Sequence, residues 1–93
     1  MLKRYKVFGD SMLPILKNGQ QVIVEKFSYL FFNPKINDIV ILKNPDNINI
    51  IKRITKKEGN SYFVEGDNAK ESADSRKFGF IQKKEILGKV IKM

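Results

Sequence analysis

The sequence of 93 residues contains no cysteine, no histidine and no tryptophan. Without cysteine, the chain has no disulfide, no thiol nucleophile and no thiolate ligand for a metal. Without histidine, it lacks the most common general base and metal ligand, which excludes a Ser-His-Asp triad and a histidine-bound zinc site. Any hydrolytic chemistry must therefore use another base, and we expect no metal and no organic cofactor.

Long apolar runs are missing as well. No stretch approaches the roughly 20 apolar residues that a membrane-spanning helix needs. Basic residues Lys3 and Arg4 lie near the N-terminus, but no apolar run follows them as in a signal peptide. We therefore expect a single domain over residues 1–93 with no transmembrane anchor, located either in the cytoplasm or peripherally at a membrane.

Acidic residues are in the minority, with 10 against 18 basic ones, and the formal net charge is +8. The basic residues are spread over the whole sequence, as on a solvated surface rich in lysine. Such a charge attracts anionic partners of any kind, including nucleic acids, acidic proteins and anionic lipids. The charge alone therefore assigns no function.

Turn-forming pairs such as Asn18-Gly19, Asn44-Pro45 and Gly59-Asn60 interrupt the sequence at short intervals. Between them, β-branched and aromatic residues predict strands at 5–8, 21–25, 38–43, 47–56, 61–65 and 85–92. Short helical pieces fit only at 12–17 and 68–77. We predict a mostly β fold, in which one small domain forms coiled antiparallel sheets shaped as a partial barrel.

A lysine stands out in the segment NINIIKRITK at residues 47–56. Side chains alternate between the two faces of a strand, so Lys52 shares a face with Ile48, Ile50 and Ile54. Burial on this apolar face would lower the pKa of Lys52, and a neutral lysine is a general base. Alternatively, Lys52 lies near a strand end and its amine reaches water.

A serine in the segment GDSMLP is the candidate nucleophile. Ser11 follows the first predicted strand on a turn that begins at Gly9, which would expose both its hydroxyl and its backbone N–H. The hydroxyl could attack a carbonyl carbon, and the N–H could stabilise the resulting oxyanion. The alternative is an ordinary turn serine or a serine that caps a helix.

Four segments, GDSMLPIL, NDIV, IKRI and GDNAKESADSRKFG, resemble in this order the sequence boxes of the type I signal peptidases. Members of that family are serine endopeptidases with a Ser-Lys dyad. The chain departs from the family pattern at Asn37, where glycine is usual, and at Ile15, where threonine is more usual. Family members generally carry an N-terminal membrane anchor, so we expect this chain to be a minimal catalytic core.

The resemblance implies a role for individual residues. Ser11 matches the nucleophile of the family and Lys52 its general base. Ser72 matches a serine whose hydroxyl orients the lysine amine. Asp74 and Arg76 match a charged pair that supports the site from behind, although without the resemblance they would be interpreted as a surface ion pair.

The resemblance also implies a reaction and a substrate. The chain would cleave a signal or leader peptide from a precursor protein, after small residues, with the substrate docked as an extended strand. The oxyanion hole would comprise Gly9 and Ser11. Family members with serine at the Gly9 position gain a hydroxyl donor there, and here that second donor would be missing or supplied by the backbone. The sequence does not indicate an oligomeric state.

The aromatic segment at 27–32 contains Phe27, Tyr29, Phe31 and Phe32. Aromatic side chains flanked by lysines suit a membrane interface, and this segment could provide peripheral membrane contact. The alternative is that these residues pack in the core of the small domain.

Two other functions remain open. LexA-like autoproteases share the Gly-Asp-Ser-Met turn and a downstream lysine, but they cut an upstream linker, and only eight residues precede Gly9 here. The chain could also be an inactive homologue that binds peptides or nucleic acid. Since Tyr62 and Phe63 would lie on opposite faces of one strand, we expect no aromatic platform and no nucleic acid partner.

Overall fold

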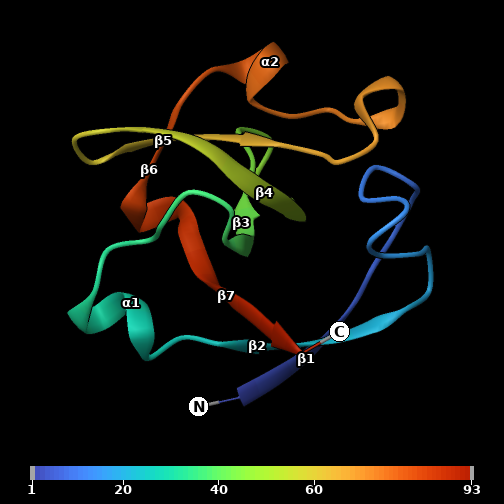
Figure 1. Cartoon of the computed structure of the whole chain (residues 1–93), viewed down its shortest axis with the longest axis horizontal. Helices are drawn as coiled ribbons and strands as arrows, with labels where there is room; N and C mark the ends of the chain where they lie inside the picture. The colour runs from blue at the N-terminus through green and yellow to red at the C-terminus, as the bar shows by residue number, and fades with distance from the viewer. Residues whose placement is uncertain (1, 93) are drawn as a thin grey trace.

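The computed structural model describes residues 2–92, without the side chain of Lys92 (Figure 1). Its strands are β1 (Leu2–Lys6), β2 (Gln21–Glu25), β3 (Ile39–Lys43), β4 (Asn49–Glu58), β5 (Ser61–Glu65), β6 (Ile81–Gln82) and β7 (Ile86–Lys92). Two helices of one turn, α1 (Ser28–Phe31) and α2 (Ser75–Phe78), and two short 3-10 helices, η1 (Ala69–Glu71) and η2 (Lys83–Glu85), connect them. Every helix in this part of the chain is too short to span a bilayer.

The strands form one antiparallel sheet in the order β1-β2-β7-β3-β4-β5-β6. The register shifts at three places, after Ile23, Ile41 and Ile54, as at β-bulges. Bulges increase local twist, and Figure 1 shows β1 and β2 crossing below the β3–β4 pair. The predicted mostly β domain with a curled antiparallel sheet is confirmed.

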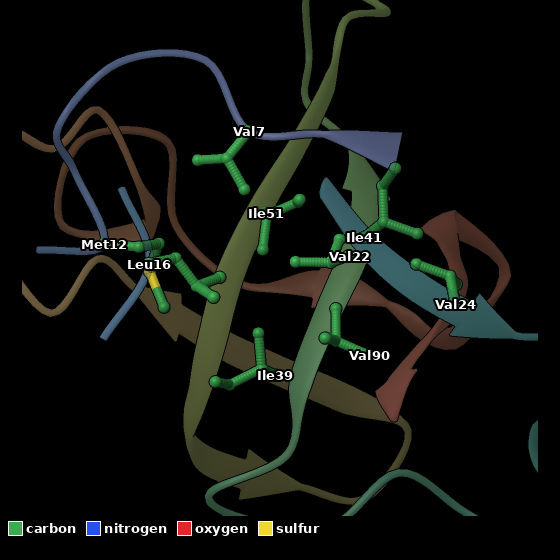
Figure 2. Close-up of a cluster of buried hydrophobic side chains, with 9 residues drawn as sticks. All are labelled: Val7, Met12, Leu16, Val22, Val24, Ile39, Ile41, Ile51 and Val90. Carbon is green, nitrogen blue, oxygen red and sulfur yellow. The ribbon is translucent and has the colours of Figure 1, made fainter. Parts of the chain in front are cut away.

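The core lies on both faces of β3. Ile39 and Ile41 point into one cluster, and Val40 and Leu42 point into the other. Figure 2 shows the first cluster, which gathers side chains from β2, β3, β4, β7 and the segment after β1: Val7, Met12, Leu16, Val22, Val24, Ile39, Ile41, Ile51 and Val90. An uninterrupted apolar run suits a strand that is covered on both sides.

The segments predicted at 21–25 and 61–65 are strands with these bounds, whereas the first strand ends at Lys6. The helix predicted at 12–17 is wrong, because this segment forms turns with only one helical hydrogen bond, from Leu16 N–H to the Met12 carbonyl. Pro14 disfavours the helical conformation at the residue before it. The piece predicted at 68–77 divides into η1 and α2.

Asn37, the departure from the family pattern before β3, has a φ of +79°. Glycine adopts this left-handed conformation without cost, and asparagine tolerates it better than other residues. The Asn37 N–H donates to the Ile54 carbonyl at 2.7 Å and so connects this turn to β4. The substitution therefore keeps the backbone geometry that glycine would provide.

Candidate active site

The turn after β1 and the first half of β4 bring Ser11 and Lys52 together, although they are 41 positions apart in the sequence. The Lys52 Nζ lies 2.6 Å from the Ser11 Oγ and donates a hydrogen bond to it. When the amine is neutral, the same short distance allows the hydroxyl to donate its proton to the nitrogen. This geometry suits a nucleophile and its base.

Lys52 is only 4% exposed, so its amine does not reach out into water. Burial lowers the pKa of Lys52 below its ordinary value, since an apolar setting disfavours the charged form. The negative charge of Asp74 opposes this shift, and the positive charge of Arg76 adds to it. The face shared with Lys52 is buried at Ile54 and half-buried at Ile50, but Ile48 is exposed, contrary to the prediction.

A loop after β5 holds the backbone of the Ser11 turn. The Asn68 N–H donates to the Ser11 carbonyl at 2.8 Å, and the Asn68 side-chain amide donates to the Asp10 carbonyl at 3.1 Å. Gly66 lies where this loop passes closest to the turn. A Cβ on Gly66 would lie 2.6 Å from the Ser11 carbonyl oxygen and would also overlap the Ser72 hydroxyl. The close approach therefore requires glycine.

Ser72 and Asp74 form a hydrogen-bonded network behind the Ser11–Lys52 pair. The Ser72 hydroxyl donates to Asp74 Oδ2 at 2.5 Å and accepts from the Gly66 N–H at 3.1 Å. No hydrogen bond joins Ser72 to Lys52 within residues 2–92. The Ser72 hydroxyl therefore donates its proton to Asp74. The predicted hydrogen bond between Ser72 and the Lys52 amine is not formed.

Asp74 is completely buried, so it is not the surface carboxylate of an exposed ion pair. Besides Ser72, it accepts from the Gly66 N–H at 2.8 Å and from the guanidinium of Arg76 at 2.6 and 3.0 Å. Burial alone would raise the pKa of Asp74, but the hydrogen bonds from Arg76, Ser72 and the Gly66 N–H hold it well below its usual range. Asp74 thus stays ionised and fixes the loop around Gly66.

A second ion pair next to Lys52 was not expected from the sequence. The Arg53 guanidinium donates to both carboxylate oxygens of Asp67 at 2.9 Å and to the Asn37 carbonyl at 3.1 Å. This pair joins β4, at the residue after Lys52, to the loop that carries Gly66 and Asn68. Both Arg53 and Asp67 lie in segments that the sequence singles out, but their spacing in the sequence does not predict that they form an ion pair.

The two predicted oxyanion donors differ in availability. The Gly9 N–H donates to the Asn18 side-chain oxygen at 2.8 Å and is therefore occupied. Because of this hydrogen bond to Asn18, the Gly9 N–H is not available as an oxyanion donor in this structure. In the described chain the Ser11 N–H has no acceptor, so it remains available to a developing oxyanion.

A pocket of about 470 Å³ opens beside the Ser11–Lys52 pair. Its walls are the end of β1 with the residues that follow it, the start of β4, and one residue of β3: Tyr5, Lys6, Val7, Phe8, Ser11, Met12, Ile41, Ile48, Asn49, Ile50, Ile51 and Lys52. Most of these side chains are apolar, as in a site that binds an uncharged segment of a peptide. Within residues 2–92, no cluster of acidic side chains could hold a metal ion.

The aromatic residues of the segment 27–32 do not line this pocket. Phe27, Phe31 and Phe32 are exposed, so the alternative that they pack in the core is wrong for these three. Tyr29 is half-buried, and its hydroxyl donates to Asp38 Oδ2 at 2.7 Å. Tyr29 therefore faces the domain and not the solvent.

The family model for signal peptidase, peptidase S26, matches this chain over residues 1–61 and 55–93. The chain belongs to the signal peptidase family. It is 29% identical to signal peptidase I V of Bacillus subtilis, over 90% of this chain and 80% of that protein. It is 30% identical to the mitochondrial ATP-independent inner membrane protease subunit 1b of Arabidopsis thaliana, over 90% of this chain.

A third relative in this family is the mitochondrial inner membrane protease subunit 1 of Xenopus tropicalis, with 29% identity over 88% of this chain. The chain spans 64% of the length of the Arabidopsis protein and 62% of the Xenopus protein. It therefore spans somewhat less than two thirds of these two relatives.

Proposed function

We propose that this chain is a serine endopeptidase that removes a signal or leader peptide from a precursor protein by means of a Ser11–Lys52 dyad. The observation that carries this proposal is the 2.6 Å separation of the Ser11 Oγ from the amine of a buried lysine. Membership of the signal peptidase family supports the reaction class. The relatives named signal peptidase or inner membrane protease support a precursor protein as substrate.

The reaction begins when the neutral Lys52 amine accepts the Ser11 proton as Oγ attacks the scissile carbonyl carbon. The oxyanion of the tetrahedral intermediate accepts a hydrogen bond from the Ser11 N–H. The Lys52 ammonium then donates its proton to the leaving amine, and an ester joins the substrate to Ser11. In deacylation, Lys52 takes a proton from a water molecule as the water oxygen attacks the ester carbonyl carbon. The Lys52 ammonium then returns a proton to the Ser11 Oγ as the ester bond breaks.

The substrate would enter as an extended strand. Residues 49–52 of β4 pair with β3 on one side, whereas β5 pairs with β4 only from Arg53 onward. β1 is one of the two edge strands of the sheet, and its end lies across the pocket from the start of β4. A peptide between these two free edges could form main-chain hydrogen bonds, with small side chains entering the apolar pocket.

The test is cleavage of a precursor with an Ala-x-Ala site by the wild type, Ser11→Ala and Lys52→Ala. We expect each variant to lose at least about a thousandfold in kcat/KM. Lys57→Ala is the matched control, since Lys57 is exposed on the same strand and should leave the rate unchanged. Circular dichroism spectra should show that all variants are folded.

Two outcomes would contradict the proposal. Retained activity in Ser11→Ala or Lys52→Ala would exclude the dyad. Cleavage of the chain itself, at a rate independent of its concentration and without cleavage of the precursor, would support the autoprotease alternative.

A further inference from the structure

The strand β1 has one free edge. It pairs with β2 from Leu2 to Lys6, and within residues 2–92 no strand pairs with its other side. The end of β1 and the residues that follow it form one wall of the pocket beside Ser11. A peptide strand added at this edge would therefore lie along β1 and reach the Ser11–Lys52 pair.

The side chains at the end of β1 point alternately inward and outward. Val7 is buried in the first core cluster, and Tyr5 packs against that cluster. Lys6, between them, is exposed and lies on the opposite face. A peptide strand paired with β1 has the same alternation. Every second side chain of the peptide would therefore enter the pocket, and the intervening ones would lie on the face of Lys6.

The charged side chains that line the pocket are all basic. They are Lys6 and Lys52, and no lining residue is acidic. Arg4 lies on the same face of β1 as Lys6, two residues earlier. On the opposite wall, Lys43 donates to the Asn49 side-chain oxygen at 3.2 Å. Lys6 is thus the exposed cation that a peptide at the free edge of β1 would meet at the pocket.

Three acidic residues in the adjoining segments reduce the positive potential of this region. Asp10 lies in the turn after β1, Asp46 lies in the turn between β3 and β4, and Glu25 ends β2 beside the N-terminal end of β1. None of them lines the pocket or forms an ion pair with Lys6. The net charge around the pocket is therefore small, and selection of a charged substrate depends on the nearest group, Lys6.

We propose that Lys6 selects substrates with an acidic residue at x in the site Ala-x-Ala. This inference rests on the proposed function, in which the small side chains on either side of x enter the apolar pocket. The side chain of x then points to the face of Lys6, and its carboxylate forms an ion pair with the ammonium group. A basic residue at x would instead meet a like charge.

Three precursors that differ only at x test this selection, with the sites Ala-Glu-Ala, Ala-Gln-Ala and Ala-Lys-Ala. The wild type should cleave the glutamate precursor at least about threefold faster than the lysine precursor in kcat/KM, with the glutamine precursor between them. Sodium chloride at about 0.5 M should bring the three rates closer together, because salt screens exposed charges. A ratio that salt does not change would contradict an ion pair.

Reversal of the charge at Lys6 should reverse the preference. In Lys6→Glu, the lysine precursor should be cleaved faster than the glutamate precursor. Lys84→Glu is the matched control, since it changes the net charge equally at an exposed residue of η2 that does not line the pocket. Its ratio of rates should equal that of the wild type. The same change of ratio in both variants would assign the preference to net charge and overturn the role of Lys6.

Binding without cleavage separates this inference from the proposed function. In Ser11→Ala, fluorescence anisotropy of labelled peptides with the same three sites should show the tightest binding for glutamate and the weakest for lysine. Equal affinities for the three peptides, or equal cleavage rates for the three precursors, would overturn the selection by Lys6 and leave the peptidase activity in place. If no precursor is cleaved but the order of affinities holds, only the proposed function is contradicted. Absence of binding by all three peptides would overturn the selection as well.

Discussion

Gly66 is the position at which a single methyl group should separate catalysis from stability. In Gly66→Ala, the new Cβ would lie 2.6 Å from the Ser11 carbonyl oxygen, against about 3.0 Å for the closest real contacts of this kind. The Ser11 turn or the Ser72 side chain must therefore move by several tenths of an ångström. Since the Ser11 carbonyl belongs to the nucleophile itself, the attacking Oγ would move with it.

The expected magnitudes follow from this displacement. Overpacking of a tight site costs about 1 to 3 kcal/mol, and the stiffer unfolded chain of an alanine variant returns about 0.4 to 1 kcal/mol. We expect a net loss of about 1 to 2 kcal/mol in the free energy of unfolding. A shift of about half an ångström in the nucleophile should lower kcat roughly tenfold or more.

Gly88→Ala is the matched control, because a Cβ on Gly88 would also lie under 3.0 Å from a side-chain atom and a backbone oxygen, although the crowding at Gly66 is greater. It would lie 2.6 Å from Val24 Cγ1 and 2.8 Å from the Glu25 carbonyl, at the β2–β7 contact and away from the pocket. The assay compares urea unfolding with kcat for precursor cleavage in both variants. Equal losses of kcat in Gly66→Ala and Gly88→Ala would refute the positioning argument.

Three other perturbations have defined outcomes. Lys52→Met should raise the free energy of unfolding at neutral pH. Because the pKa of Lys52 is lowered in the folded state, the stability of the wild type relative to this variant should rise with pH between that pKa and 10.5. The slope measured by urea unfolding should be at most about 1.4 kcal/mol per pH unit. A stability difference between the wild type and Lys52→Met that does not change with pH would contradict the burial of Lys52. Asp74→Asn should lower the free energy of unfolding by about 2 to 4 kcal/mol in thermal unfolding, because donors of Arg76 and Gly66 lose their carboxylate acceptor. A loss below about 1 kcal/mol would contradict a stabilising role of this network. Asn68→Ala should lower kcat several-fold and leave KM nearly unchanged, since it removes one hydrogen bond to Asp10 worth about 1 kcal/mol, and an effect confined to KM would argue against positioning.

The sequence predicts much of the fold because several strands carry their signal locally. The segment QVIVE at 21–25 alternates buried residues with exposed or half-buried ones, and the turn pair before it precedes its start. The segment 12–17 misleads because its apolar residues have helical spacing, whereas the backbone turns there and buries only Met12 and Leu16. The spacing of the apolar residues alone does not show that the backbone turns around Pro14 and does not continue as a helix.

The candidate site was predictable where a residue departs from the apolar pattern of its strand. Lys52 is charged on an apolar strand face, and this anomaly is visible without any resemblance. The contacts that hold the site were not predictable, because they depend on how the loop after β5 lies against the Ser11 turn. Gly66 and Asn68 are far from Ser11 in the sequence and contact it only in the folded chain. The loss of Gly9 as an oxyanion donor depends on the side chain of Asn18, nine residues away, which no pattern in the sequence connects to it.

The central claim is that Lys52 is neutral enough at physiological pH to act as a base for Ser11. The most direct measurement is an NMR titration of the lysine side chains, with the Lys52 signal assigned by its absence from Lys52→Met. We predict that the Lys52 amine of the resting protein titrates below 10.5, because its burial disfavours the charged form. A Lys52 amine that titrates at 10.5 or above would contradict the account.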